Sequence, residues 1–309
     1  MSIADRIFKK NCKTILSYYD KVPSRAIWPD TKEQAYTLKT FGIVNTYNLK
    51  KEFPALTLRK TSIKTAFDEL LWIWQKKSNN INDLNSHIWD QWTDSSGSIG
   101  KAYGYQMRQK YYHHKVTKEQ LREFICNSIQ NYPSAEVEIL NNEIYVKLDQ
   151  TDAILWDLSN NPLSRRIMTN IYNFSDLYEM NLYPCAYSMT FNCTTGKNNQ
   201  LVLNGILNQR SQDMLVANNW NVCQYSLLIM MLAQCCNMVP GKLVHVISDC
   251  HIYDRHISII KDLIKREEYP APKVWFDPNI KNFYEFTPNH LHIEDYITGE
   301  QITNIPVAV

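Results

Sequence analysis

The sequence predicts one α/β domain that spans residues 1–309. Helical apolar spacing and strand-like alternation follow each other along the chain, and no internal repeat, low-complexity tract or linker divides it. Residues 220–238 form a nearly all-apolar helical segment, and residues 243–249 have the pattern of a buried strand. A chain of 309 residues is long enough to bury a large core, so both segments are expected to lie deep inside it.

Composition and charge exclude several classes of function. The chain is 44% hydrophobic and 21% charged, which is ordinary for a globular protein. Its 33 basic and 31 acidic residues nearly balance, which gives no whole-chain reason to bind nucleic acid or a membrane surface. The start of the chain lacks the apolar region of a signal peptide, and no apolar stretch is long enough to span a bilayer. The eight cysteines are scattered without a CxxC pair, so we expect a cytoplasmic protein with reduced thiols and no metal site.

The N-terminal half is predicted to alternate helices with short strands. Apolar residues recur at helical spacing in three segments, and a β-rich run over residues 41–47 separates the first two. Thr61 or Ser62 is the expected N-cap of the second helix. Trp89 and Trp92 form an aromatic cluster in an otherwise polar stretch. The expected helices are residues 4–20, 61–76 and 116–131.

The C-terminal half begins with a predicted β-hairpin. The alternating segment 132–148 has Asn141-Asn142 at its centre, and we interpret residues 133–146 as a surface insertion. Two further strands within residues 184–209 flank a Thr-Gly-Lys turn. The remaining expected helices are residues 149–159, 175–180 and 251–267.

Cys185 is the candidate nucleophile. It follows Pro184 at the start of a predicted strand, although a lone cysteine is more often a small buried hydrophobic residue. The run Gln209-Arg210-Ser211-Gln212-Asp213 follows one hairpin later. An arginine close to a thiol lowers the pKa of that thiol, and arginine together with serine can bind phosphate.

Four other places carry polar groups that fit a binding site. Arg165 and Arg166 offer forked donors to an anion, although adjacent arginines more often form a solvated surface. Asn221 stands at the start of the apolar helix, where its amide either binds a ligand as donor and acceptor or merely caps the helix. Glu69 lies in an apolar stretch, so its carboxylate either faces solvent or is buried with a raised pKa. The run Asp249-Cys250-His251-Ile252-Tyr253 adds hydrogen-bonding side chains at alternate positions.

A series of short motifs, each weak by itself, occurs in one order along the chain. They are Glu69-Leu70-Leu71-Trp72, Ile88-Trp89-Asp90-Gln91-Trp92, Tyr103-Gly104, Ser164-Arg165-Arg166, Pro184-Cys185, Gln209-Arg210-Ser211-Gln212-Asp213, Asn221, Asp249-Cys250-His251-Ile252-Tyr253 and the terminal Pro306-Val307-Ala308-Val309. Together they resemble the folate-dependent thymidylate synthase family, and in particular one bacterial and phage subtype of it. The resemblance runs from Arg25 to Val309, which is nearly the whole chain.

The resemblance implies a fold and a reaction. The implied fold is a single α/β domain with a bent mixed β-sheet and surrounding helices, which pairs sheet-to-sheet into a homodimer. The implied reaction is the reductive methylation of dUMP to dTMP with 5,10-methylenetetrahydrofolate as co-substrate and without a metal. In it, Cys185 attacks C6 of the pyrimidine, C5 takes the methylene group, and a hydride from the folate completes the methyl group. Neither a membrane nor a nucleic acid is required as partner.

The resemblance also implies roles for individual residues. Those with a catalytic role are Cys185, Glu69, Arg210, Asn221 and Tyr103. Those that bind dUMP are Arg25, Gln209, Arg210, Ser211, Asp213, Asn221, His251 and Tyr253, with Arg165 and Arg166 supplied by the other subunit. Those that line the folate side are Ile88, Trp89, Trp92, Leu182, Asp213 and Val309.

Departures from the family pattern leave two alternatives open. Residues 217–220 (Ala-Asn-Asn-Trp) replace the usual glycine-proline-phenylalanine approach to the asparagine, next to the pyrimidine and the folate. A hydroxymethylase acting on deoxyuridylate, or less readily on deoxycytidylate, would share the Cys185 chemistry but add water instead of hydride. A catalytically silent nucleotide-binding paralogue is the other alternative, although it would have no chemical reason to keep both Cys185 and Glu69. Two further departures are Ala186, where histidine is common, and Arg59, where lysine is common.

Overall fold

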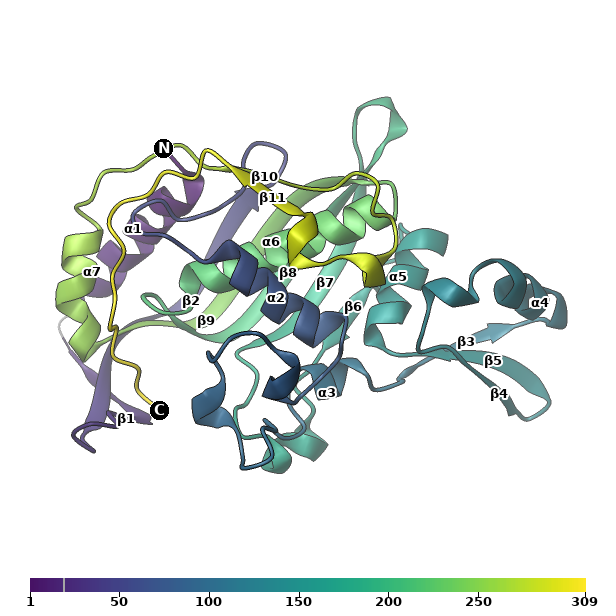
Figure 1. Ribbon diagram of the computed structural model, residues 1–309, viewed down its shortest axis with the longest axis horizontal. Helices are drawn as coiled ribbons and strands as arrows, with labels where there is room; N and C mark the ends of the chain where they lie inside the picture. The colour runs from purple at the N-terminus through teal and green to yellow at the C-terminus, as the bar shows by residue number, and fades with distance from the viewer. Residues whose placement is uncertain (19) are drawn as a thin grey trace.

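The structure of the chain, a computed structural model, describes residues 1–18 and 20–309. A mixed six-stranded sheet lies at its centre in the order β1-β2-β9-β8-β7-β6 (Figure 1). β8 and β9 are parallel, and the other neighbouring pairs are antiparallel. The strands of this sheet are β1 (Val22–Ile27), β2 (Gln34–Asn48), β6 (Met168–Asn170), β7 (Ala186–Thr195), β8 (Leu201–Asp213) and β9 (Val239–Tyr253).

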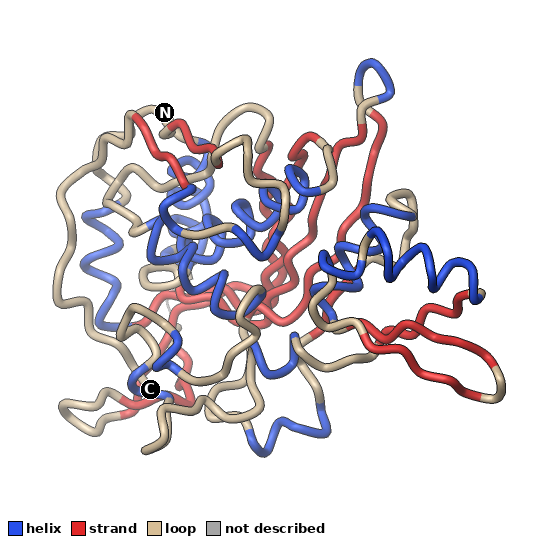
Figure 2. The backbone as a smooth tube through the Cα atoms, turned by 45° about the vertical axis from the view of Figure 1, so that its right-hand side comes forward, coloured by secondary structure: helices blue, strands red, loops and turns tan. Residues whose placement is uncertain are grey.

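Helices cover one face of this sheet (Figures 1 and 2). α6 packs on β8 and β9, α2 packs on α6, and α1 lies against β2 and β9. α6 is buried over most of its length because it lies between the sheet and α2, as its nearly all-apolar sequence predicts. Among residues 1–18 and 20–309, no helix has the length and apolar character needed to cross a membrane. The α-helices are α1 (Ile3–Leu16), α2 (Ile63–Trp74), α3 (Gly104–Met107), α4 (Lys118–Asn127), α5 (Gln150–Asn160), α6 (Asn218–Cys235) and α7 (Ile257–Leu263). Short 3₁₀ helices are Ile81–Asp83, Asp90–Trp92, Ile129–Asn131, Phe174–Glu179, Lys197–Asn199, Asp254–His256, Phe283–Glu285 and Pro288–His290.

The central sheet bends where its strand register shifts. β7 and β8 change register between Ala186 and Ser188, and β8 and β9 do so between Leu203 and Gly205. An extra residue on one strand bends that strand and increases its twist. Gly205 lets α6 come close at this bend, because a Cβ there would lie 2.8 Å from the side chain of Ile229. The expected bent mixed sheet with surrounding helices is therefore confirmed.

A second sheet, in the order β3-β5-β4, projects from the side of the molecule together with α4 (Figure 1). Asn141 and Asn142 join β4 to β5 with φ angles of 50° and 63°, as a two-residue type I′ hairpin turn requires. The predicted hairpin is confirmed, while its status as an insertion stays a prediction. The strands outside the central sheet are β3 (Tyr112–Val116), β4 (Glu136–Leu140) and β5 (Glu143–Leu148), and the pair β10 (Lys273–Phe276) and β11 (Leu291–Glu294).

Two predicted helix boundaries are wrong. The helix expected over residues 251–267 starts later, because the chain remains in β9 as far as Tyr253, paired with β2. The helix expected over residues 4–20 ends at Leu16, and position 19 lies outside the described residues. For the segment 251–267, pairing with β2 therefore decides where the helix can start, and local apolar spacing does not report it.

The face of the central sheet opposite α6 carries exposed apolar side chains. Val44 is 63% exposed and Ile206 is 40% exposed. Val44 pairs with Val246 and Ile206 pairs with Val244, so all four side chains lie on the same side of the sheet. This apolar face has no covering helix within the described part of the chain.

Candidate active site

Cys185 lies at the turn that leads into β7, beside Arg210 of β8. Nη2 of Arg210 is 3.7 Å from Sγ of Cys185. The same guanidinium donates to the carbonyl oxygens of Tyr183 and Pro184, at 2.7 and 3.0 Å. The backbone N–H of Arg210 donates to the carbonyl of Cys185 at 2.9 Å. One arginine thus holds the turn that carries the thiol and places a positive charge against it.

Two opposing effects act on the pKa of the Cys185 thiol. Burial raises the pKa of this thiol above its ordinary value, and the charge of Arg210 lowers it in part. The sequence predicts only the lowering of the thiol pKa by Arg210, because it does not show how deeply the thiol is buried. The net shift is upward because removal of the thiolate from water costs more than the single charge restores.

Tyr103 and two tryptophans line the site next to Cys185. The backbone N–H of Cys185 donates to the hydroxyl of Tyr103 at 3.3 Å. Tyr103 has a φ of 46°, a strained value for a residue with a side chain and one that is often found at functional sites. The ring of Trp89 lies 4.8 Å from that of Tyr103 and 5.7 Å from that of Trp92. The other predicted folate neighbours on these segments are Ile88 and Leu182.

Glu69 is buried in α2, which begins after the expected N-cap residue Ser62. Its Oε2 accepts a hydrogen bond from Nε1 of Trp220 at 2.6 Å. Burial raises the pKa of Glu69 to about 7, and the hydrogen bond from Trp220, followed by the nearby donors of Gln224 and Trp89, opposes this rise. A carboxyl group with a pKa near neutrality can both take up and release a proton during a reaction. Of the two interpretations of Glu69, the buried one is right.

Asn221 lies in the first turn of α6, which begins at Asn218, so its interpretation as a plain helix cap is wrong. Its Oδ1 accepts from Nε2 of Gln209, and its Nδ2 donates to Oε1 of Gln224, both at 3.3 Å. Oε1 of Gln209 lies 2.7 Å from Nε2 of His245. Burial lowers the pKa of His245 to about 3, so the imidazole is neutral and Nε2–H donates to Gln209. This chain of contacts fixes the direction of the Asn221 amide.

Asp213 connects the site to the C-terminal segment. Its Oδ1 accepts two backbone N–H bonds from the loop that follows β8 and lies 3.6 Å from Nδ1 of His256. Burial raises the pKa of Asp213, but the nearby imidazole of His256, together with His251 and the backbone N–H of Leu215, outweighs this effect and holds the pKa below its ordinary value. Nε2 of His256 lies 2.7 Å from the carbonyl oxygen of Pro306. Val309 forms two backbone hydrogen bonds with Ile27, which places the chain end on β1 (Figure 1).

His251 and Tyr253 lie at the end of β9, beside the candidate phosphate-binding run of β8. The parallel register pairs Ser211 with Asp249 and Asp213 with His251. Nδ1 of His251 is 2.7 Å from Oδ1 of Asp249, and the rings of His251 and Tyr253 lie 5.1 Å apart. Two motifs that are distant in sequence are therefore side by side in the sheet.

Three predicted phosphate ligands lie apart from this cluster. Arg25 lies on β1, where the pairing with β2 is irregular, and Arg165 and Arg166 precede β6. All three side chains are exposed, and none forms a side-chain hydrogen bond or ion pair with residues 1–18 or 20–309. Within one chain, the structure therefore does not join them to the thiol.

Sequence reasoning missed three neighbours of the site. Trp220 belongs to the segment that departs from the family pattern, and its residue type alone does not show that its indole reaches Glu69. His245 and His256 are single histidines in a strand and a short turn, and nothing in their local pattern shows that they point inward. All three contacts depend on segments far apart in the sequence.

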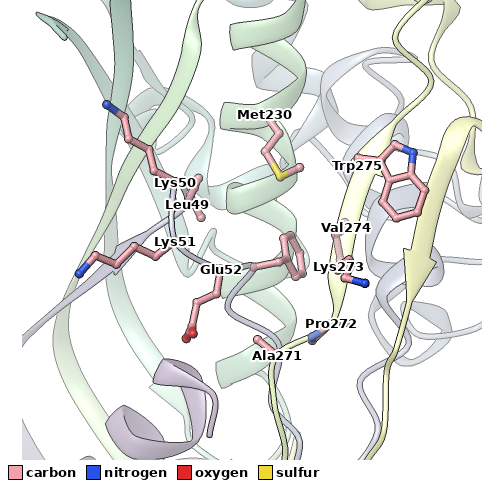
Figure 3. A pocket seen from close by; sticks show the side chains of 11 residues that line it. Leu49, Lys50, Lys51, Glu52, Met230, Ala271, Pro272, Lys273, Val274 and Trp275 are labelled. Atoms are coloured by element: carbon pink, nitrogen blue, oxygen red, sulfur yellow. The ribbon is translucent and has the colours of Figure 1, made fainter. Parts of the chain in front are cut away.

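A cavity of about 320 Å³ lies elsewhere in the molecule, between the loop after β2, the strand β10 and the helix α6 (Figure 3). The side chains of Lys50 and Lys51 point away from this hollow in Figure 3. None of the predicted site residues lines it. Its lining consists of Leu49, Lys50, Lys51, Glu52, Phe53, Met230, Ala271, Pro272, Lys273, Val274 and Trp275.

Comparisons with known proteins agree with the motifs. The family model described as thymidylate synthase matches residues 6–309. The thymidylate synthase of Bacillus licheniformis is 38% identical over 282 residues, covering 90% of this chain and 88% of that protein. The thymidylate synthase of Bacillus phage phi3T is 36% identical over 281 residues, with the same two shares. The structure of thermostable thymidylate synthase A from Bacillus subtilis matches 99% of both chains with a TM-score of 0.82 at 34% identity. The family resemblance is confirmed, and the chain belongs to the thymidylate synthase family.

Proposed function

We propose that this chain methylates dUMP to dTMP through the thiol of Cys185, with 5,10-methylenetetrahydrofolate as co-substrate. The reaction follows from family membership. The observation that carries the role of Cys185 is the guanidinium of Arg210, 3.7 Å from its sulfur, in a site that also holds Glu69 and Tyr103. A thiolate nucleophile and a carboxyl group with a near-neutral pKa are the groups that addition to a pyrimidine ring needs.

The proposed reaction begins when the Cys185 thiolate attacks C6 of the uracil ring, and the C5–C6 electron pair moves toward O4. The Asn221 amide donates to O4 and accepts from N3–H, so it stabilises the developing enolate without reorganisation. C5 then forms a bond to the one-carbon unit of the folate and loses its proton, with Tyr103 and Glu69 assisting. The electron pair left on C5 breaks the bond between that carbon and the folate nitrogen, which gives an exocyclic methylene group and tetrahydrofolate. Hydride transfer from tetrahydrofolate to this methylene restores the C5–C6 double bond and expels the Cys185 thiolate, so that dTMP and dihydrofolate form.

The aromatic side of the site fits a reduced folate. Trp89 and Trp92 offer flat apolar surfaces for a pterin. Asp213 is held ionised by His256, which suits it to accept hydrogen bonds from the N–H groups of such a ring. The C-terminal segment ends nearby at Val309, and a segment in this place can exclude water from a reactive intermediate.

The phosphate of dUMP is a dianion, which needs several charge-assisted donors. Arg210 and Ser211 lie on one strand beside Cys185, while Arg165 and Arg166 are exposed and free to reach another chain. The apolar sheet face around Val44 offers a surface for such a partner. These observations support a sheet-to-sheet homodimer in which Arg165 and Arg166 complete the partner's phosphate site, with Arg25 as a further ligand.

Three broader expectations belong to the same proposal. The chain acts as one domain over residues 1–309, because β1 and β9, from opposite ends of the sequence, join the same sheet. Residues 133–146 are then a surface insertion that carries most of the projecting hairpin. The enzyme works in the cytoplasm.

The proposal is tested by trapping the covalent adduct. Protein mixed with 5-fluoro-dUMP and 5,10-methylenetetrahydrofolate should gain the mass of both ligands. Cys185→Ser should lose this adduct while calorimetry still detects dUMP binding. Cys126→Ser, which changes an exposed cysteine of α4, is the matched control and should keep the adduct. An adduct that persists in Cys185→Ser would assign the nucleophile to another residue.

A further inference from the structure

One strong hydrogen-bond donor, Trp220, contacts the carboxylate of Glu69, and the proposed reaction gives this donor no role. Glu69 is only 6% exposed, and no residue among those described forms an ion pair with it. Its one well-formed side-chain hydrogen bond comes from Nε1 of Trp220 at 2.6 Å. Nε1 of Trp89 and Nε2 of Gln224 lie near but have no hydrogen-bond partner of their own in the described chain. The ionised form of Glu69 therefore depends mainly on one indole.

Trp220 is placed to connect the two helices of the site. It is the third residue of α6 and stands directly before Asn221, while Glu69 lies on α2, which packs against α6. The bond joins positions that are 151 residues apart in the sequence. The same helical turn therefore carries the amide expected to read the pyrimidine and the donor that holds the carboxylate.

The residue type at this position matters for the chemistry. The family resemblance places phenylalanine before the asparagine, and a phenylalanine ring has no hydrogen to donate. A hydrogen bond to an ionised acceptor is shorter and roughly twice as strong as a neutral one. Such a bond favours the carboxylate over the carboxylic acid, so it counteracts the effect of burial on Glu69.

We propose that Trp220 is a positioning residue for Glu69: its indole N–H holds the carboxylate in one orientation and sets the pH range in which Glu69 exchanges a proton. This inference deepens the proposed function and rests on the role assigned there to Glu69. Trp220 acts through Glu69 and is not itself a catalytic residue. A purely structural tryptophan would contribute to folding and leave the pH dependence of turnover unchanged.

The test compares the pH dependence of kcat in four proteins. Glu69→Gln first identifies which limb of the wild-type profile belongs to Glu69, because that limb disappears. Trp220→Phe keeps the ring and removes the donor, so the carboxylate loses stabilisation and the Glu69 limb should move to higher pH by about one unit. Trp72→Phe is the matched control, since the indole of this buried residue donates to the carbonyl of Asn80 at 2.9 Å. Its Glu69 limb should stay at the wild-type pH.

Each outcome decides one claim. Thermal unfolding of both tryptophan variants shows that they are folded, and infrared titration of the Glu69 carboxyl in the unliganded proteins gives its pKa without turnover. A limb and a carboxyl titration that do not move in Trp220→Phe would overturn the role of Trp220. A limb that survives in Glu69→Gln would instead overturn the proposed role of Glu69. If the Glu69 limb moves equally in Trp220→Phe and Trp72→Phe, the shift comes from a general loosening of the core and the role of Trp220 is overturned.

Discussion

Nη2 of Arg210 lies 3.7 Å from the sulfur of Cys185. The same side chain donates hydrogen bonds to the carbonyls of the two residues that precede Cys185. Arg210 therefore acts on the nucleophile in two ways. Its charge favours the thiolate, and its hydrogen bonds fix the turn that carries the thiol. Burial opposes the first effect and leaves the pKa of the Cys185 thiol raised. The two effects of Arg210 can be separated by substitution.

We expect Arg210→Gln to slow the modification of Cys185. The substitution removes the one charge that lowers the thiol pKa, so the pKa rises further and the thiolate fraction at mildly alkaline pH falls about tenfold. The rate of alkylation by iodoacetamide, followed for each cysteine by mass spectrometry across pH, measures this change. The exposed Cys126 is the internal reference, and Arg210→Lys, which keeps the charge, should show a smaller shift. An alkylation midpoint that is equal in wild type and Arg210→Gln would contradict the electrostatic role.

Asn221 should decide between uracil and cytosine. Its amide oxygen has two lone pairs and its amide nitrogen has two hydrogens, so the contacts with Gln209 and Gln224 leave one of each for the base. Uracil offers O4 and N3–H, which match, whereas cytosine offers an amino group and an unprotonated N3. Sites built on such bonds discriminate by roughly 10⁴-fold.

Asn221→Asp should therefore lower kcat/KM for dUMP and raise kcat/KM for dCMP relative to it. Steady-state assays with both nucleotides give the ratio. Asn160→Asp, at the exposed end of α5, makes the same chemical change away from the site and should leave the ratio alone. If the ratio is the same in Asn221→Asp as in wild type, Asn221 does not contact the ring.

The sequence predicts those helices and turns that are favoured by their own residue types. α6 is apolar nearly all round and is buried between two layers, and Asn141-Asn142 form the turn that their residue type favours. The start of α7 could not be predicted, because residues 251–253 have an ambiguous local pattern and are held in β9 by pairing with β2. Strand pairing is a long-range property that no short window contains.

The candidate site was predictable as a set of residues but not as a set of contacts. The order of the motifs identifies Cys185, Arg210 and Glu69 as site residues. Only the parallel register of β8 and β9 shows that the motifs on these two strands lie side by side. The bond between Glu69 and Trp220 depends on the packing of α2 on α6, which residue types alone do not reveal. The net pKa shift of Cys185 depends on burial for the same reason.

Subunit mixing should show whether Arg166 acts across a dimer interface. Arg166→Ala and Cys185→Ser, each nearly inactive alone, should regain activity when mixed, because each heterodimer then contains one site with both wild-type groups. After complete exchange in equal amounts, about a quarter of all sites should be active. Turnover is measured after native mass spectrometry has confirmed heterodimers. Persistent inactivity in proven heterodimers would place Arg166 in the site of its own chain or on a surface without function.

The nature of the product depends on the segment that departs from the family pattern. Asn219 lies in it, and an unpaired polar side chain there could hold a water molecule close to the site. Both ends of the Asn219 amide are bonded: its Oδ1 accepts from the Leu56 N–H and the Thr61 hydroxyl, both at 2.8 Å, and its Nδ2 donates to the carbonyl of Pro54 at 3.0 Å. Nδ2 of the neighbouring Asn218 is buried without a partner among the described residues. Asn219 therefore ties α6 to the chain before α2, and its polar groups are already paired.

We therefore expect dTMP and dihydrofolate as the products. The methylene group on the ring accepts either a hydride or water, and the choice depends on how well water is excluded while the folate is bound. Trp89 is buried against Tyr103, and the C-terminal segment is joined through Pro306 and His256 to Asp213, so both favour hydride transfer. Mass spectrometry of the nucleotide and the absorbance of dihydrofolate identify the products, and Trp89→Ala should raise any fraction formed with water. A nucleotide heavier than dTMP by one oxygen, released with tetrahydrofolate and without dihydrofolate, would show a hydroxymethylase instead.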